Sequence, residues 1–199
     1  MLPYHMMASR MPTLQLKLCS SPPLARPELS LPTMPEILAA SRLQGIRLGL
    51  LTLGPFFRVT VEGLTGKELG RLEGFIRPWI SGKILHLDSI RMKKETISMQ
   101  RSIFGIGLFV GAAAIRHGYD CNCRRAELLA INDSPLLHSR LVRFYTRMGF
   151  NPVHEVDGSS FADISHMLVW GGRGTLMDAD IEDLLRKWSK RFKPKALQE

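Results

Sequence analysis

The chain has 199 residues, 45% of them hydrophobic, which predicts one globular domain with room for a core and with tails at its ends. Lysine and arginine outnumber aspartate and glutamate by 27 to 18, and the formal net charge of +9 suits a polyanionic partner. The basic residues are dispersed among acidic ones without interleaved aromatics, which argues against a nucleic-acid binder, and no apolar run reaches the ~18 residues of a membrane-spanning helix.

The three cysteines, Cys19, Cys121 and Cys123, are too few and odd in number for a disulfide framework and fit a reducing compartment. Cys121 and Cys123 follow His117, but a structural zinc site takes four ligands at other spacings. We therefore expect free thiols and no metal site.

The N-terminal residues 1–35 contain several prolines, show no sustained period and have Glu28 as their first acidic residue. Such an acid-poor stretch is predicted to be an unpacked leader, either an organelle presequence or a leader with no address. Residues 35–43 are predicted to form a short helix with proline in its first turn, and Gly54-Pro55 then breaks the chain.

Three strands are predicted next, over residues 56–62, 69–79 and 84–91. The first alternates apolar and polar residues and is rich in β-formers, and Pro78 makes the end of the second irregular or edge-like. Because short turns join the three strands, we expect an antiparallel meander.

Two glycines one residue apart, Gly105 and Gly107, come where a loop leads into an apolar helix. Glycine lets the backbone approach a ligand, and the first N–H groups of a helix have no intrahelical partner and carry the positive end of the macrodipole. Together these features predict a phosphate-binding site. The alternative is a tight turn with close helix–sheet packing.

The remaining chain is predicted to continue with a buried strand at residues 125–131, parallel to its predecessor through a right-handed crossover, and a helix ended by Gly149. A hairpin of residues 152–156 and 164–170 closes the sheet, and glycines at 171–174 end the domain. Residues 178–192 are predicted to form an amphipathic helix that packs on the domain, with dimer contact as the alternative role. Its apolar face consists of Ile181, Leu184, Leu185, Trp188 and Phe192.

The order of strand, Gly-x-Gly helix, strand and a helix ending in Phe144-Tyr145-x-Arg147-x-Gly149-Phe150 resembles the GNAT superfamily of acyl-CoA N-acyltransferases over about residues 58–170. The resemblance implies a single α/β domain whose mixed sheet contains splayed parallel strands, with helices on both faces and an extra C-terminal helix. It places the N-acetyltransferase domain at residues 36–175 and the helix and basic tail at 176–199. The usual Arg or Gln at the start of the glycine motif is Ser102 here, and the usual Asn seven residues before the helical tyrosine is His138.

Acetyl-CoA is the co-substrate that the resemblance implies. Its pyrophosphate would lie on the glycine loop, and its amide-bearing pantetheine would pair with a strand edge near Ile90 and Ala130. The residues expected to bind it are Ile90, Arg101, Ser102, Ile103, Phe104, Gly105, Ile106, Gly107 and Asn132.

The resemblance gives Tyr145 the role of general acid, which a phenol with a pKa near 10 can fill; the alternative is a core aromatic with a wet hydroxyl. For the base, His86 and Asp88 lie two apart on one strand and hence on one face, where pairing would orient the imidazole. Glu73 on the neighbouring strand is the other candidate. Each of the three has an alternative role in a solvated face or a structural hydrogen bond, and positioning alone can replace a dedicated base.

We thus expect transfer of an acetyl group to an amine, either a protein lysine or N-terminus or a small molecule. The first alternative is a non-catalytic acyl-CoA-binding or interaction module with the same fold, and the second is a basic nucleic-acid binder. The chain is similar to plant plastid-type members of the superfamily, which predicts a chloroplast or other organelle stroma or matrix, with the cytoplasm as the alternative. The oligomeric state is left open, a homodimer included.

Overall fold

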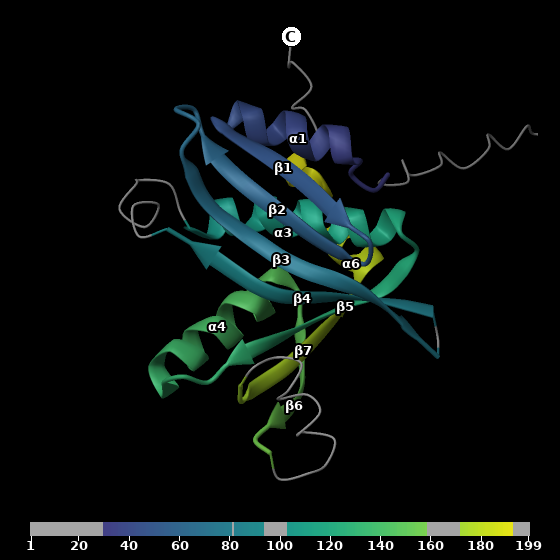
Figure 1. Ribbon diagram of the computed structural model, residues 1–199, viewed down its shortest axis with the longest axis vertical. Coiled ribbons are helices and arrows are strands. Elements are labelled where there is room, and N and C mark those ends of the chain that lie inside the picture. Colours follow the sequence, from purple (N-terminus) through teal and green to yellow (C-terminus); the bar gives the residue numbers. More distant parts are fainter. Residues whose placement is uncertain (1–29, 81, 94–102, 159–171, 193–199) are drawn as a thin grey trace, which may run out of the picture.

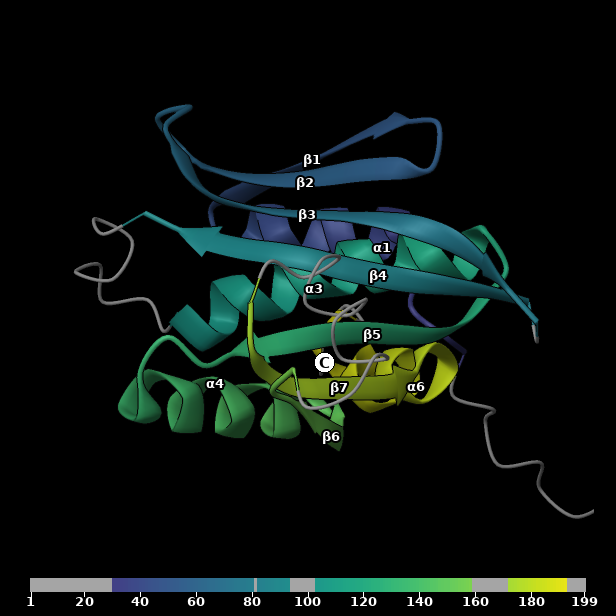
Figure 2. The same ribbon diagram turned by 60° about the horizontal axis from the view of Figure 1, so that its bottom comes forward.

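The computed structural model describes residues 30–80, 82–93, 103–158 and 172–192. In this part of the chain a seven-stranded sheet has the order β1-β2-β3-β4-β5-β7-β6, and helices pack against it (Figures 1 and 2). The strands are β1 (Ile46–Leu53), β2 (Phe56–Gly63), β3 (Glu68–Trp79), β4 (Gly82–Met92), β5 (Cys123–Ile131), β6 (Asn151–Val156) and β7 (Gly174–Asp180). The helices are α1 (Met34–Leu43), α3 (Ile103–Asp120), α4 (Pro135–Met148) and α6 (Ile181–Phe192). The predicted single mixed α/β domain is confirmed.

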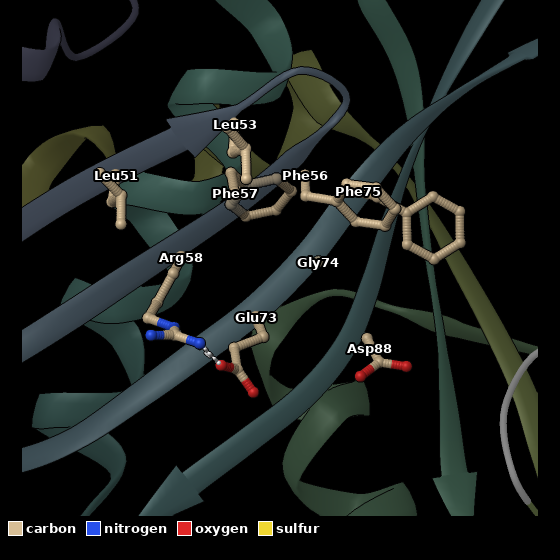
Figure 3. Close-up of a pocket in the computed structure, with 9 residues that line it drawn as sticks. All are labelled: Leu51, Leu53, Phe56, Phe57, Arg58, Glu73, Gly74, Phe75 and Asp88. Atoms are coloured by element: carbon tan, nitrogen blue, oxygen red, sulfur yellow. Dashed lines mark hydrogen bonds and ion pairs between the residues drawn. The ribbon is translucent and has the colours of Figure 1, made fainter.

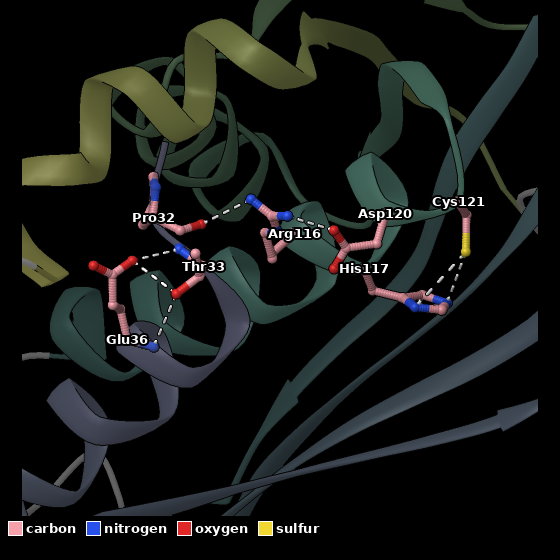
Figure 4. Close-up of polar contacts among 7 residues, drawn as sticks. All are labelled: Pro32, Thr33, Glu36, Arg116, His117, Asp120 and Cys121. Carbon is pink, nitrogen blue, oxygen red and sulfur yellow. Dashed lines mark hydrogen bonds and ion pairs between the residues drawn. The ribbon is translucent and has the colours of Figure 1, made fainter. Parts of the chain in front are cut away.

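Helix α1 begins at a capping box. The Thr33 hydroxyl accepts a hydrogen bond from the Glu36 amide at 3.4 Å, and the Glu36 carboxylate accepts one from the Thr33 amide at 2.7 Å. The buried Pro32 belongs to the packed domain, because its carbonyl accepts from Nη1 of Arg116 on α3 at 3.2 Å (Figure 4). Packing therefore starts before residue 35, and the predicted leader over residues 1–29 lies outside the described residues.

Strand β1 is an addition that the sequence did not reveal. It pairs antiparallel with β2 across a turn at Gly54, whose φ of +58° favours glycine. Only Ile46 and Leu48 of β1 are buried, while the leucines from Leu50 onward are exposed. Without a sustained alternation, this segment has no strand signal of its own.

The meander of β2, β3 and β4 is confirmed, with one irregularity. Glu73 of β3 lies opposite Ser89 of β4, and the next residue, Gly74, lies opposite Leu87. Asp88 is therefore the extra residue of a β-bulge in β4. A Cβ atom at position 74 would collide with the carbonyl oxygen of His86, so glycine permits this close approach.

Strands β4 and β5 are parallel, as predicted, but they pair only from Lys83 opposite Cys123 to Leu87 opposite Leu128. Beyond this point β4 stays paired with β3, and β5 stays paired with β7 up to Ile131. The two strands diverge toward their carboxyl ends, with the start of α3 on the same side of the molecule (Figure 1). The expected splay is confirmed.

The described helices lie on one face of the sheet. Helix α3 packs beneath β1 to β5 with Gly118 against Leu85, and α1 and α6 contact α3. Helix α4 joins this layer, because the Trp188 indole of α6 donates to the Met148 carbonyl at 2.9 Å. Helices are expected on both faces, but within the described residues the structure has them on one face only. None of these helices is long and apolar enough to cross a membrane.

The end of the chain differs from the prediction in one element. β6 forms its hairpin with β7, which occupies the positions predicted to end the domain and to start the helix. Helix α6 begins at Ile181 instead of Asp178, because the Asp180 carboxylate accepts a hydrogen bond from the Asp183 amide at 3.0 Å and caps it there. The predicted apolar face of the helix is buried. The strand predicted at 164–170 lies outside the described residues.

Candidate functional site

The first feature of the site is the start of α3 beside the diverging strands. The helix already includes Ile103, so Gly105 and Gly107 lie in its first turns and not in a loop before it, which corrects the prediction. The amides of residues 103–106 lack intrahelical partners and carry the positive end of the helix dipole. A Cβ atom at Gly105 would meet no atom of the described residues within 4 Å, so these residues leave the turn open to a ligand.

Gly107 serves a different purpose from Gly105. A Cβ atom at this position would lie 3.1 Å from Cζ of Phe144 on α4. Its missing side chain lets α3 and α4 approach each other, so this glycine permits a helix–helix contact and not the helix–sheet packing that the sequence left open as the alternative. The expected ligands Arg101 and Ser102 lie outside the described residues, as do the side chains of Ile103 and Phe104.

The second feature is a pair of strand edges that face each other across the split. Ile90 lies on β4 past the last pair with β5 and is half-buried opposite Leu72 of β3. Ala130 lies on the facing part of β5, which is paired on its other side with β7. Asn132 follows the strand, is exposed and donates its amide to the Arg173 carbonyl at 2.8 Å. The facing edges present N–H and C=O groups that the two strands do not exchange with each other.

Tyr145 lies on α4, whose cap residues are Ser134 at the start and Gly149 at the end, the latter with a φ of +119°. Its ring packs edge-on against Phe144 and Phe150, with centroids 5.3 and 6.2 Å away. Burial raises the pKa of Tyr145 to about 12. The phenol is therefore protonated at neutral pH, the state that a general acid requires.

His86 does not pair with Asp88 as the sequence suggested. Its Nδ1 lies 3.2 Å from Oε1 of Glu127 on β5, and its ring stacks on Phe75 with centroids 4.2 Å apart. The bulge shifts Asp88 out of the regular alternation, so the two residues do not share the environment that an i, i+2 spacing implies. His86 is fully buried, which keeps its ring from contact with a substrate in this structure.

The buried carboxylate that the sequence did not single out is Glu127. Its Oε1 accepts hydrogen bonds from Nη2 and Nε of Arg77 at 2.7 and 3.0 Å. Burial raises the pKa of Glu127, but the hydrogen bonds and charges of His86 and Arg77 outweigh it and bring the pKa below its ordinary value. Glu127 thereby joins β3, β4 and β5 one residue before the split. Only the register of β4 and β5, which places His86 opposite Glu127, identifies this carboxylate as part of the site, and a single sequence does not contain that register.

Glu73 and Asp88 line a pocket of about 590 Å³ on the sheet face opposite the helices (Figure 3). Glu73 is engaged, with its carboxylate 2.6 Å from Nη2 of Arg58 and 3.5 Å from the Ser89 hydroxyl, which donates to it. Asp88 is exposed. Of the candidate bases, the structure thus brings Glu73 and Asp88 to one pocket, whereas His86 is buried and does not line it.

The described residues hold no cluster of metal-ligating side chains. Cys121 Sγ lies 3.9 Å from both ring nitrogens of His117 (Figure 4), and both cysteines among these residues are free thiols. Burial, followed by the neighbouring Cys121, raises the pKa of Cys123 to about 11, against a weaker effect of Lys83. Cys123 is therefore a protonated thiol at neutral pH and no nucleophile.

No family model and no curated protein matches this chain. Solved structures similar to it include a point mutant of the spermidine N-acetyltransferase SpeG from Vibrio cholerae, 15% identical over 67% of this chain and 69% of that chain, with a TM-score of 0.49. The same enzyme in complex with CoA and spermine is 15% identical over 66% of this chain and 69% of that chain, with a TM-score of 0.47. A nourseothricin acetyltransferase is 15% identical over 64% of this chain and 66% of that chain, with a TM-score of 0.46. The function of this chain is therefore inferred from its own geometry.

Proposed function

We propose that the chain is an acyl-CoA-dependent N-acetyltransferase, which transfers an acetyl group from acetyl-CoA to an amine. The observation that supports this most is the parting of β4 and β5 after Leu87 and Leu128, together with the open first turn of α3 on the same side. The facing edges of β4 and β5 can pair with the amides of a ligand, and the first amides of α3 beside them can bind its diphosphate.

The residues present fit such a ligand. Among the described residues, nothing fills the turn at Gly105, so the first amides of α3 can receive the pyrophosphate, and the edges around Ile90 and Ala130 can pair with pantetheine amides. Acetyl-CoA brings the activated acyl group, held as a thioester. The formal charge of +9 favours the approach of a polyanion.

In the proposed reaction a bond forms between the amine nitrogen and the acyl carbon, and the carbon–sulfur bond breaks. The sulfur gains one proton and the neutral amine loses one; an acceptor that arrives as an ammonium ion first releases a further proton to solvent. We assign the first transfer to the Tyr145 hydroxyl, whose pKa of about 12 keeps the proton available. The second proton leaves toward the pocket of Glu73 and Asp88, directly or through water, since His86 is buried. Positioning of the amine supplies the rest of the acceleration.

The proposal is tested by acetyl-CoA-dependent thermal stabilisation combined with an acetyl-transfer assay on a panel of amines. A ligand at 100 times its Kd stabilises the folded state by about 2.7 kcal/mol, which for a domain of this size is a rise in Tm of about 5–11 °C. No rise in Tm at millimolar acetyl-CoA would refute the proposal. A rise without transfer to any amine would favour the non-catalytic binding module instead.

The variant Gly105→Glu locates the binding site. Its carboxylate would enter the open first turn of α3, where it complements the helix dipole by about 0.3–1 kcal/mol but repels a phosphate. We expect an unchanged or higher Tm without ligand and at least a tenfold weaker effect of acetyl-CoA. The matched control is Gly105→Ala, which adds a methyl group at the same open position without charge and should keep the acetyl-CoA effect.

A further inference from the structure

We propose that the pocket opposite the helices binds the acceptor as a primary ammonium ion carried on a hydrophobic, preferably aromatic, group, with Asp88 as the residue that receives the ammonium. This substrate class rests on the proposed acetyl transfer. The pocket, of about 590 Å³, has a size typical of sites for small organic molecules.

The register shows that the pocket walls belong to one sheet face. Leu51, Arg58 and Glu73 lie opposite one another on β1, β2 and β3, and so do Leu53, Phe56 and Phe75 in the next row. Directly opposed residues project to the same side of a sheet. Both rows line the pocket (Figure 3).

Asp88 lies where the pocket face of the sheet meets the gap between β4 and β5. Leu87 is the last residue of β4 that pairs with β5, and Asp88 is the next residue, in the bulge. Bulges re-aim side chains next to active sites. An acceptor held by Asp88 therefore lies on the pocket side of the gap, while a ligand at the start of α3 reaches the gap from the helix side.

The charges in the pocket leave one carboxylate for the ligand. Arg58 and Glu73 neutralise each other, with Nη2 and Oε1 2.6 Å apart. Asp88 has no ion pair or hydrogen bond to any described residue, although it lines a pocket whose other walls are mostly apolar. One unpaired carboxylate suits a single ammonium, whereas a polyamine would bring two or more positive charges beside the Arg58 guanidinium.

The apolar walls favour a hydrophobic substituent on that amine. Leu51, Leu53 and Phe56 are 66%, 79% and 59% exposed, and Phe56 packs on Phe75 with ring centroids 5.9 Å apart. Grouped exposed hydrophobic side chains around a concavity mark a binding site. They would lose water contact on binding an aromatic or branched aliphatic group, which provides binding energy that a hydrophilic amine does not.

The same chemistry exists in free arylalkylamines and in peptides with a hydrophobic N-terminal residue, so the assay includes both. With saturating acetyl-CoA, transfer is measured to 2-phenylethylamine, tryptamine, a peptide with N-terminal Phe, a peptide whose only amine is a lysine, and spermidine. We expect kcat/KM for at least one hydrophobic amine to exceed that for spermidine and for the lysine peptide at least tenfold. A preference for spermidine or for the lysine peptide would overturn the inference.

Two variants assign the roles of the two parts of the pocket. Asp88→Asn should raise KM for the preferred amine about tenfold or more, the usual effect of losing one charged partner, without weakening acetyl-CoA binding. The matched control is Glu62→Gln, a carboxylate on β2 outside the pocket, which should leave KM unchanged. Leu53→Ser, at a largely exposed position that folding does not need, should raise KM for 2-phenylethylamine but not for methylamine.

The outcomes separate this inference from the proposed function. If acetyl-CoA raises the Tm and transfer occurs, but Asp88→Asn behaves like Glu62→Gln, the acceptor assignment is wrong and the acetyltransferase stands. If acetyl-CoA has no effect on Tm, the proposed function is wrong. Direct binding of 2-phenylethylamine, followed by NMR without acetyl-CoA and abolished by Asp88→Asn, would still support the pocket in that case.

Discussion

The substitution of Glu127 is the change whose effect on stability the structure predicts in most detail. Oε1 of Glu127 accepts hydrogen bonds from Arg77 Nη2 at 2.7 Å and Nε at 3.0 Å and lies 3.2 Å from His86 Nδ1, so it links three strands at the base of the split. We expect the isosteric change Glu127→Gln to weaken the sheet there. Removing one partner from a buried ion pair costs about 3–5 kcal/mol, because the other charge stays desolvated.

The expected magnitude lies at the lower end of that range. The side chain of Glu127 is 10% exposed and that of Arg77 is 29% exposed, so water relieves part of the unpaired charge. The glutamine oxygen also keeps one hydrogen bond. We therefore expect a loss of about 2–3 kcal/mol in the free energy of unfolding and a fall in Tm of roughly 4–12 °C.

Urea denaturation and thermal melts at pH 7 measure this loss, with Asp178→Asn as the matched control. Asp178 lies directly opposite Glu127 on β7, but its partner Arg125 is 62% exposed at 3.3 Å, so that this pair contributes less than about 1 kcal/mol. Equal losses in the two variants would refute the reasoning.

The pH dependence provides a second check on the same residue. The pKa of Glu127 is lowered from 4.5 in the folded state, so its contribution is complete above that ordinary value and disappears as the pH falls through the lower folded pKa. The stability difference between wild type and Glu127→Gln should stay constant from about pH 6 to 8 and shrink below about pH 4.5. A difference that persists into strong acid would show that the carboxylate charge is not its cause.

Two further predictions concern helix α4. Tyr145→Phe should lower kcat about 100-fold or more while the effect of acetyl-CoA on Tm stays unchanged. Because burial raises the pKa of Tyr145 to about 12, the wild-type rate should not fall through loss of this proton below about pH 11. An unchanged kcat of the variant in a steady-state assay would argue against Tyr145 as the acid. Gly149→Ala should destabilise the fold by about 1–3 kcal/mol in thermal melts, because φ is +119° and the new Cβ would lie 2.8 Å from Leu184 Cδ2; an unchanged Tm would contradict this geometry.

The parts of the fold that the sequence predicts are those with a local signal. The meander follows from alternation and short turns, the end of α4 from Gly149, and the parallel pair from the long connection through α3. In each case neighbouring residues carry enough information, because the signal depends on the chain's own backbone geometry and not on distant partners.

The parts that the sequence does not predict depend on tertiary contacts. The exposed leucines of β1 acquire strand structure by pairing with β2, and Asp178 belongs to a strand because β5 and β6 lie on either side of it. Strand alternation predicts that His86 pairs with Asp88, but a bulge interrupts this alternation. The true neighbour of His86, Glu127, is 41 residues away along the chain and reaches it only through the parallel register.

The same bulge bears on how one sheet would serve the two ligands of the proposed reaction. A continuous β4–β5 ladder would separate the helix face from the pocket face, so a group bound at the start of α3 could not meet a group bound above Phe75. Pairing that stops at Leu87 opens the sheet, and the extra residue Asp88 places a carboxylate at that opening instead of in the ladder. The bulge in turn needs the close approach of β3 that Gly74 permits. Gly74, itself a lining residue of the pocket, thus shapes the place where the acyl group and the amine of the proposed reaction would meet.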